Sequence, residues 1–202
     1  MVWMVVCVPL LGSLFLPLLG GYSLKLRNWS ALGLVVASFI CAAALLPVVD
    51  QGRLVPVAAA DFTWFQADRL AIFMALVSLG VGSVIVAYSH GYIAHYRWQN
   101  EYYFMVVLFL GAMMGLVFSQ NLILIFVFWE ITALACWRLI GFFRKDPCVI
   151  RADKAFLVTV FGALMMLIGF IMIFGQTGSF DLGVIHHATR DHRISNLSLI
   201  HI

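Results

Sequence analysis

Residues 122–134, LILIFVFWEITAL, carry one ionisable side chain, Glu130, in a stretch that is otherwise uncharged. The stretch opens a longer apolar run that ends at Phe142. A helix needs about 20 mostly apolar residues to cross roughly 30 Å of hydrocarbon. A helix also satisfies its own backbone hydrogen bonds where lipid offers no partner. We therefore predict a transmembrane helix at Leu122–Phe142, with a carboxyl group near its middle.

Five further apolar stretches have the length of a membrane span. Of the 202 residues, 64% are hydrophobic and only 10% are charged, whereas a soluble domain has about 25% charged residues. A water-soluble globule of this composition would expose large apolar areas. The sequence therefore predicts an all-α integral membrane protein with about six transmembrane helices. The other five expected spans are Val2–Leu19, Trp29–Val49, Leu70–Ser89, Tyr102–Phe118 and Ala155–Phe174.

The distribution of basic residues predicts an orientation for the bundle. Loops after the first, third and fifth spans hold more Lys and Arg than those after the second and sixth, and basic loops stay in the cytoplasm. The N-terminus is therefore expected outside. In the long loop from Asp50 to Arg69, Trp64 and Phe65 are expected to be interfacial anchors. The basic residues in the loops after the first, third and fifth spans are Lys25, Arg27, Arg97, Arg144, Lys145, Arg151 and Lys154. Those in the loops after the second and sixth spans are Arg53, Arg69, Arg190 and Arg193.

Several function classes are disfavoured. The net charge is +3 and no Lys/Arg cluster suits a nucleic-acid backbone. The histidines are not paired with carboxylates at metal-ligand spacing, and no two cysteines form a C-x-x-C pair. We expect no cofactor, no metal site, no redox centre and no nucleic-acid partner. The four cysteines, best explained as small buried side chains, are Cys7, Cys41, Cys136 and Cys148.

Glu130 is the main candidate for a functional residue. An ionised side chain at a helix centre costs about 2.5–3.5 kcal/mol on insertion scales, so such residues usually mark ion or proton paths. The alternative is a neutral, hydrogen-bonded Glu that holds helices together. Arg138 lies eight residues further on the same face. Snorkelling to the cytoplasmic surface is favoured for Arg138 over a relay role. By itself, Lys154 at the start of the sixth span is a plain positive-inside residue.

Several motifs occur in the order found in one family. They are FQADRL at 65–70, QNLILIFVFWE at 120–130, LIGF at 139–142, DKAFLVT at 153–159 and GSFD at 178–181. Over residues 60–183 the chain resembles the antiporter-like membrane subunits. These include the L-type subunit of complex I, the Mrp sodium/proton antiporters and the membrane subunits of membrane-bound hydrogenase and formate hydrogenlyase. Departures from the family pattern are Trp137 and Arg138 in place of Ser-Tyr, Val160 in place of Arg and Ala163 in place of Asp.

The resemblance implies a site and a larger architecture. Glu130 falls on the family's fifth-helix glutamate, and Lys154 on the lysine before its sixth helix, which is implicated in the proton path. The family fold has about fourteen helices in two inverted repeats. We expect an N-terminal fragment of such a fold. Residues 1–100 would be helices 1–3, residues 101–180 the start of the first repeat, and residues 181–202 a polar tail, with non-native sequence at Ile194–Ile202.

The expected function is that of a proton-translocating membrane subunit. It would belong to a quinone-reductase, hydrogenase or cation/proton antiporter complex in a bacterial or archaeal cytoplasmic membrane. The resemblance implies a non-redox subunit that is not catalytic alone, with other membrane subunits and the lipid bilayer as partners and protons or sodium as the transported ion. Glu130 and Lys154 would form the relay, with Arg138 as a further member. The alternative is a non-transporting membrane scaffold that anchors a catalytic partner.

Overall fold

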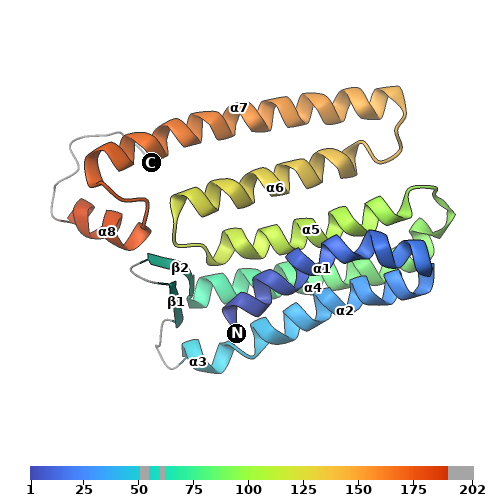
Figure 1. The fold of residues 1–202 in the computed structure, drawn as a ribbon, viewed down its shortest axis with the longest axis horizontal. Coiled ribbons are helices and arrows are strands. Elements are labelled where there is room, and N and C mark those ends of the chain that lie inside the picture. The colour runs from blue at the N-terminus through green and yellow to red at the C-terminus, as the bar shows by residue number, and fades with distance from the viewer. Residues whose placement is uncertain (51–54, 60–61, 191–202) are drawn as a thin grey trace.

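The computed structural model describes residues 1–50, 55–59 and 62–190 (Figure 1). Arg53, Asp61, Arg193 and the expected non-native segment Ile194–Ile202 lie outside these residues. In the described part, six helices are long and apolar enough to cross a membrane. This confirms the predicted class, a multi-pass membrane protein built from about six transmembrane helices. The spanning helices are α1 (Val2–Tyr22), α2 (Leu24–Ala43), α4 (Arg69–Tyr92), α5 (Gln99–Phe118), α6 (Leu122–Ile140) and α7 (Asp146–Thr177).

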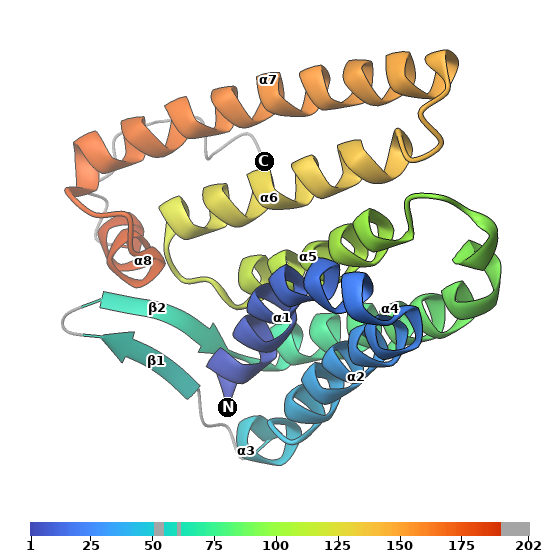
Figure 2. The ribbon, with the colours of Figure 1, turned by 45° about the vertical axis from the view of Figure 1, so that its right-hand side comes forward.

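The helices form a compact group with two helices added at one side. Helices α1, α2, α4 and α5 pack together, α6 packs on α5, and α7 packs on α6 (Figures 1 and 2). Only Ala152 and Ala163 are buried on α7. The outer face of α7 is therefore a surface for lipid or for another helix. The short elements are α3 (Leu46–Asp50), the 3-10 helix Ile93–His95 and α8 (Leu182–Arg190).

Polar side chains set the starts of the helices that carry the site. Asp68 accepts a hydrogen bond from the backbone N–H of Ala71 at 2.6 Å and caps α4. Asn121 accepts one from Ile123 at 2.9 Å and caps α6. Such caps satisfy N–H groups that have no partner within the helix. At the end of α7, Gly178 has φ +68, which a residue without Cβ adopts without strain.

Residues 55–59 and 62–67 form two paired strands, here called the hairpin, where the sequence predicted only a loop. Strands β1 (Val55–Ala59) and β2 (Phe62–Ala67) pair antiparallel, with an irregularity between Val57 and Ala58. Phe65 is 2% exposed and its ring centroid lies 4.8 Å from that of Trp3 and 6.1 Å from that of Phe128. The expected interfacial anchor is therefore wrong for Phe65, which closes one end of the bundle. Trp64, at 40% exposure, faces outward.

Two helices, α2 and α7, begin five or more residues earlier than the sequence predicted. The second begins at Leu24, so Lys25 and Arg27 lie in α2 and not in a loop, and Arg27 is fully buried. The last spanning helix begins at Asp146. Lys154 therefore lies in the third turn of α7 and does not open it. In both cases the helix continues through basic residues, because polar groups near a helix end reach water or polar partners.

Candidate functional site

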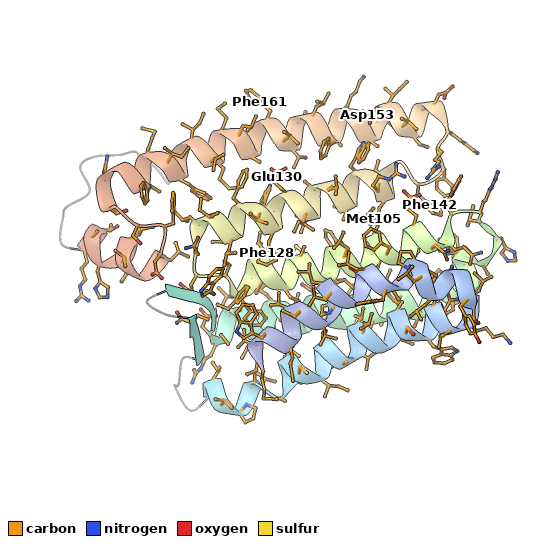
Figure 3. The ribbon with its side chains drawn as sticks, in the orientation of Figure 1. Met105, Phe128, Glu130, Phe142, Asp153 and Phe161 are labelled. Carbon is orange, nitrogen blue, oxygen red and sulfur yellow. The ribbon has the colours of Figure 1, made fainter. Side chains whose placement is uncertain are left out.

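Glu130 lies midway along α6 (Figure 3). Its Oε1 atom is buried and has no hydrogen-bond partner among the described residues. The side chain as a whole is half-buried. Because Asn121 fixes the start of α6 and the helix is regular from Leu122 onward, the carboxyl group is held at this depth. A buried acceptor without a partner loses its hydration and gains nothing in return.

The carboxyl group faces α7. Trp137, seven residues further along α6, donates a hydrogen bond from Nε1 to Asp153 Oδ1 at 2.8 Å. The same indole lies 5.4 Å from the ring of Phe156. Seven residues make nearly two helical turns, so Glu130 shares this face of α6. Since α6 and α7 run antiparallel (Figures 1 and 2), the opposing position on α7 is near Ala163, which is 2% exposed.

A cavity of about 330 Å³ lies beside Glu130, between α5, α6 and α7. Its lining includes Trp129 and Ala133, which precede and follow Glu130 on the helix, and it reaches Ala155 on α7. Thr132 and Thr159 supply the hydroxyl groups in the lining. They donate to backbone carbonyls of their own helices, at 2.7 and 2.8 Å. The cavity therefore offers oxygen acceptors but no free hydroxyl proton in this arrangement.

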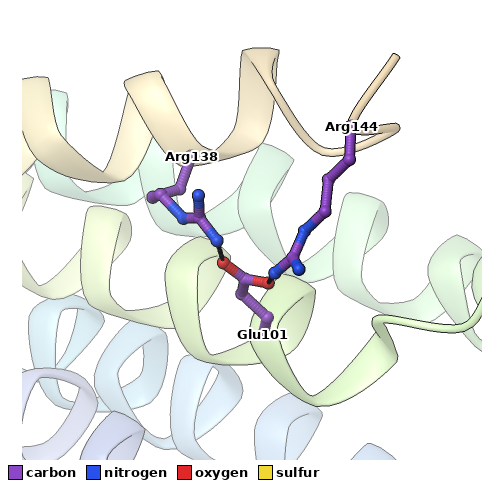
Figure 4. Close-up of polar contacts among 3 residues, drawn as sticks. All are labelled: Glu101, Arg138 and Arg144. Atoms are coloured by element: carbon purple, nitrogen blue, oxygen red, sulfur yellow. Dashed lines mark hydrogen bonds and ion pairs between the residues drawn. The ribbon is translucent and has the colours of Figure 1, made fainter. Parts of the chain in front are cut away.

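Arg138 reaches a carboxylate that the sequence analysis missed. Its Nη2 forms an ion pair with Glu101 Oε1 on α5, and Arg144 Nη2 lies 2.6 Å from Glu101 Oε2 (Figure 4). The Glu101 side chain is 24% exposed. The sequence contains a signal for this pairing, namely the short turn around Gln120 that joins the two helices. Glu101 is nineteen residues before Gln120 and Arg138 eighteen after it, so an antiparallel helix pair places them at the same level.

The other predicted site residues do not meet Glu130. Arg138 lies eight residues away on α6, about 12 Å along the axis. Lys154 is exposed on α7, and no hydrogen bond or ion pair joins it to Glu130 within residues 1–50, 55–59 and 62–190. No group of three His, Cys, Asp or Glu side chains that could hold a metal ion occurs within these ranges.

Two family descriptions match the chain. Residues 119–202 match "NADH:quinone oxidoreductase/Mrp antiporter, TM". Residues 57–104 match "NADH-Ubiquinone oxidoreductase (complex I), chain 5 N-terminus". The second match begins at the hairpin and continues into α5, and the first begins at the turn before α6 and includes Glu130. The two matches follow one another along the chain and together cover more than half of it.

Curated relatives agree with these matches. The A1 subunit of a Na(+)/H(+) antiporter of Staphylococcus haemolyticus is 35% identical over 177 residues, which are 83% of this chain and 22% of that protein. A Na(+)/H(+) antiporter subunit of Alkalihalophilus pseudofirmus is 34% identical over 190 residues, 89% of this chain and 24% of that protein. The chain thus spans about a quarter of the length of these relatives.

The fold also occurs in a solved complex. A chain of the membrane-bound sulfane sulfur reductase, an archaeal respiratory membrane complex, superposes with a TM-score of 0.87 at 18% identity. The match covers 94% of this chain and 40% of that one. At this identity the likeness concerns the fold alone, and it includes nearly all of the helices described above. Together with the family matches and the antiporter relatives, it shows that this chain belongs to the antiporter-like membrane subunits of the NADH:quinone oxidoreductase and Mrp antiporter family.

Proposed function

We propose that this chain is part of a proton-translocating subunit of a multi-subunit membrane complex, in which Glu130 takes up and releases the proton. The observation that carries the proposal is the buried Oε1 atom of Glu130, which lacks a hydrogen-bond partner in the described structure. The relatives named as Na(+)/H(+) antiporter subunits support it, because their aligned region includes most of this chain. Protons, or sodium exchanged for protons, are the proposed cargo.

The position of Glu130 explains how it would carry a proton. An ionised carboxylate at this position costs free energy, because it lies in an apolar span without compensation. An approaching positive charge or water molecules would compensate the charge of the carboxylate as the proton leaves. The cavity beside Glu130 runs toward the level of Lys154. We propose that the proton moves between Glu130 and Lys154 through this cavity, along water that enters it during turnover.

Arg138 and Lys154 take different parts in this proposal. Arg138 is held by Glu101, so its charge is compensated and stays near the end of α6. We propose that Arg138 fixes the end of the proton path that lies near the end of α6. Lys154 is exposed and has no partner among the described residues, so its ammonium group is free to move on its four-carbon side chain. We assign Lys154 to proton exchange at the end of the cavity.

The alternative, a scaffold in which Glu130 only joins helices, has less support. A structural Glu in a membrane is stabilised by hydrogen bonds to a neighbouring helix. The Oε1 atom of Glu130 makes none within the described residues, and Ala163, near the opposing position, offers only a methyl group. In the described part of the chain, no observation favours the scaffold over the relay.

The test is substitution of Glu130 in membranes that contain the chain together with its partner subunits. Glu130→Gln keeps the shape of the side chain but cannot ionise, so proton movement should fall to background. Glu130→Asp should retain part of the activity. The measurement is quenching of a pH-sensitive dye in inverted vesicles after sodium or the electron donor is added.

A matched control separates the relay from general damage. Asp146→Asn also replaces a carboxylate by an amide, but at an exposed position in the first turn of α7. This variant should transport like the unmodified protein. Protein levels in the membrane must be equal for all variants. Wild-type transport by Glu130→Gln at equal level would show that Glu130 is structural.

A further inference from the structure

Two pockets meet at the end of the bundle that carries the basic turns. The first is a groove of about 650 Å³ between α4, α5 and the end of α6. The second, of about 560 Å³, lies over the turn that follows α6. Phe142 and Phe143 line both pockets, so the two lie side by side. Figure 3 shows Phe142 at the end where α6 leads into α7.

The groove is apolar and has the length of one membrane leaflet. It extends along α4 from Val77 to Tyr92, fifteen residues or about 22 Å of helix. This exceeds half of the roughly 30 Å of bilayer hydrocarbon. Val77 is 49% exposed, so the groove opens on the outer surface. Gly82 shapes its floor, because a Cβ atom there would lie 2.7 Å from Leu110 Cδ1.

The second pocket carries positive charge. Arg97 and Lys145 line it, together with Tyr96, Trp98 and Cys148. The guanidinium carbon of Arg97 lies 5.3 Å from the centre of the Trp98 ring. Neither Arg97 nor Lys145 has a carboxylate partner within the described ranges, and Glu101 is already paired with Arg138 and Arg144. Both cations lie beside tyrosine and tryptophan side chains, which are typical of the headgroup level.

We propose that this double pocket binds one anionic phospholipid. Its phosphate would lie between Arg97 and Lys145, and an acyl chain would lie in the groove beside Val81 and Ile85. Charge complementarity favours an anionic headgroup, since these cations have no carboxylate partner among the described residues. The length and apolar lining of the groove favour an acyl chain over a soluble phosphate compound. The site does not include Glu130 and its argument does not use the proposed relay, although Met113 lines both the groove and the cavity beside Glu130.

Cys148 provides a probe in the pocket. In a protein with Cys7, Cys41 and Cys136 replaced by alanine, its reaction with a maleimide is followed in detergent while phosphatidylglycerol is added. We expect the lipid to slow the reaction in a saturable way, and phosphatidylcholine to slow it much less. Arg97→Gln with Lys145→Gln should weaken the apparent affinity for phosphatidylglycerol about thirtyfold, from the contribution of each basic residue at a lipid surface.

Control and groove variants make the result specific. Lys25→Gln with Arg151→Gln removes the same charge from exposed positions outside the pockets and should leave the affinity unchanged. Ser78→Phe fills the groove without touching the basic residues and should also weaken lipid binding. All variants are checked for unchanged thermal unfolding.

Three outcomes would overturn the proposal. The first is protection by glycerol phosphate as strong as that by the lipid, which would identify a site for soluble phosphates. The second is equal protection by phosphatidylcholine, which would show that charge is not recognised. The third is that neither lipid slows the reaction of Cys148, which is the result expected if another helix covers the groove.

Discussion

Arg27 shows how a single charged residue is accommodated inside this bundle. Its guanidinium group is fully buried and donates to amide oxygens of Asn28, Gln99 and Asn100, the Gln99 contact measuring 2.9 Å. It also lies 4.7 Å from the centre of the Tyr103 ring. In the described ranges its hydrogen-bond acceptors are all neutral. The charge is therefore stabilised by dipoles and by an aromatic face, which compensate for its loss of water.

We predict that Arg27→Leu destabilises the protein by about 3 kcal/mol or more, because hydrogen bonds to a charged group contribute about 1.5–3 kcal/mol each. The three amide oxygens, on half-buried side chains, would lose their charged donor. Thermal unfolding in detergent measures the effect. Lys25→Leu, two residues earlier and exposed, is the control and should change stability little. An unchanged melting temperature for Arg27→Leu would contradict this account.

Arg27 and Glu130 also show which residues a sequence reveals. Glu130 stands out because the cost of a charge depends on the apolar residues around it in the same span. Arg27 was assigned to a loop, since its partners are 72 and 73 positions away. Pairings at such distances depend on how helices pack. The relay role of Glu130, Lys154 and Arg138 remains a prediction, because the structure does not show a proton path.

At the scale of elements, Glu101 ties three segments together. It joins the first turn of α5 to Arg138 near the end of α6 and to Arg144 in the following turn (Figure 4). Arg144 has φ 50, in the left-handed region, and its guanidinium carbon lies 3.7 Å from the centre of the Trp98 ring. The ion pairs therefore hold a strained residue in place and fix the connection from α6 to α7.

Glu101→Gln should loosen this connection with little effect on global stability. The groups are partly exposed, so the loss should be about 1 kcal/mol. Amide hydrogen exchange in residues 141–145 should become faster, while exchange in the middle of α5 should not change. The control is Asp146→Asn, which removes a carboxylate one residue beyond the turn. Unchanged exchange in Glu101→Gln would show that the turn is held by packing alone.

The elements themselves were predicted unequally. The spanning helices follow from apolar composition over about 20 residues, which is a local property. Their ends were less clear, because α2 and α7 continue through Lys25 and Lys154. The β1–β2 hairpin was missed. Its strands are short, and a hairpin of this size gains stability from packing, here through Phe65 against Trp3 and Phe128. The proposed boundaries at residues 100 and 180 remain untested.

At the scale of the whole molecule, the turns lie at two opposite ends. The turns near Ser23, at 93–98 and at 141–145 share one end, and the hairpin, the turn at 119–121 and α8 share the other (Figure 1). We predict that the first end is cytoplasmic, because it holds more basic residues. In a protein without native cysteines, an impermeant maleimide added to intact cells should label His187→Cys but not Lys145→Cys. The reverse pattern would invert the orientation.

The last prediction is that the 202-residue chain, expressed alone, inserts into a membrane but does not move protons. Insertion follows from the six spans, each apolar enough to partition into lipid. Transport should fail because a proton path needs polar groups across the full hydrocarbon thickness. From Glu130 toward the end formed by α8, the α6–α7 interface is built from residues 122–129 and 163–174, none of which is ionisable.

Water should not bridge this gap, since it is retained in protein interiors where polar groups bind it. The test is a liposome with an internal pH dye and a potassium-diffusion potential. We expect the purified chain to give the same proton flux as empty liposomes. Glu130→Gln should then make no difference, in contrast to its effect in the assembled complex. A flux well above that of empty liposomes, and lost in Glu130→Gln, would show that these six helices contain a complete path, with water ordered on backbone carbonyls of α6 and α7.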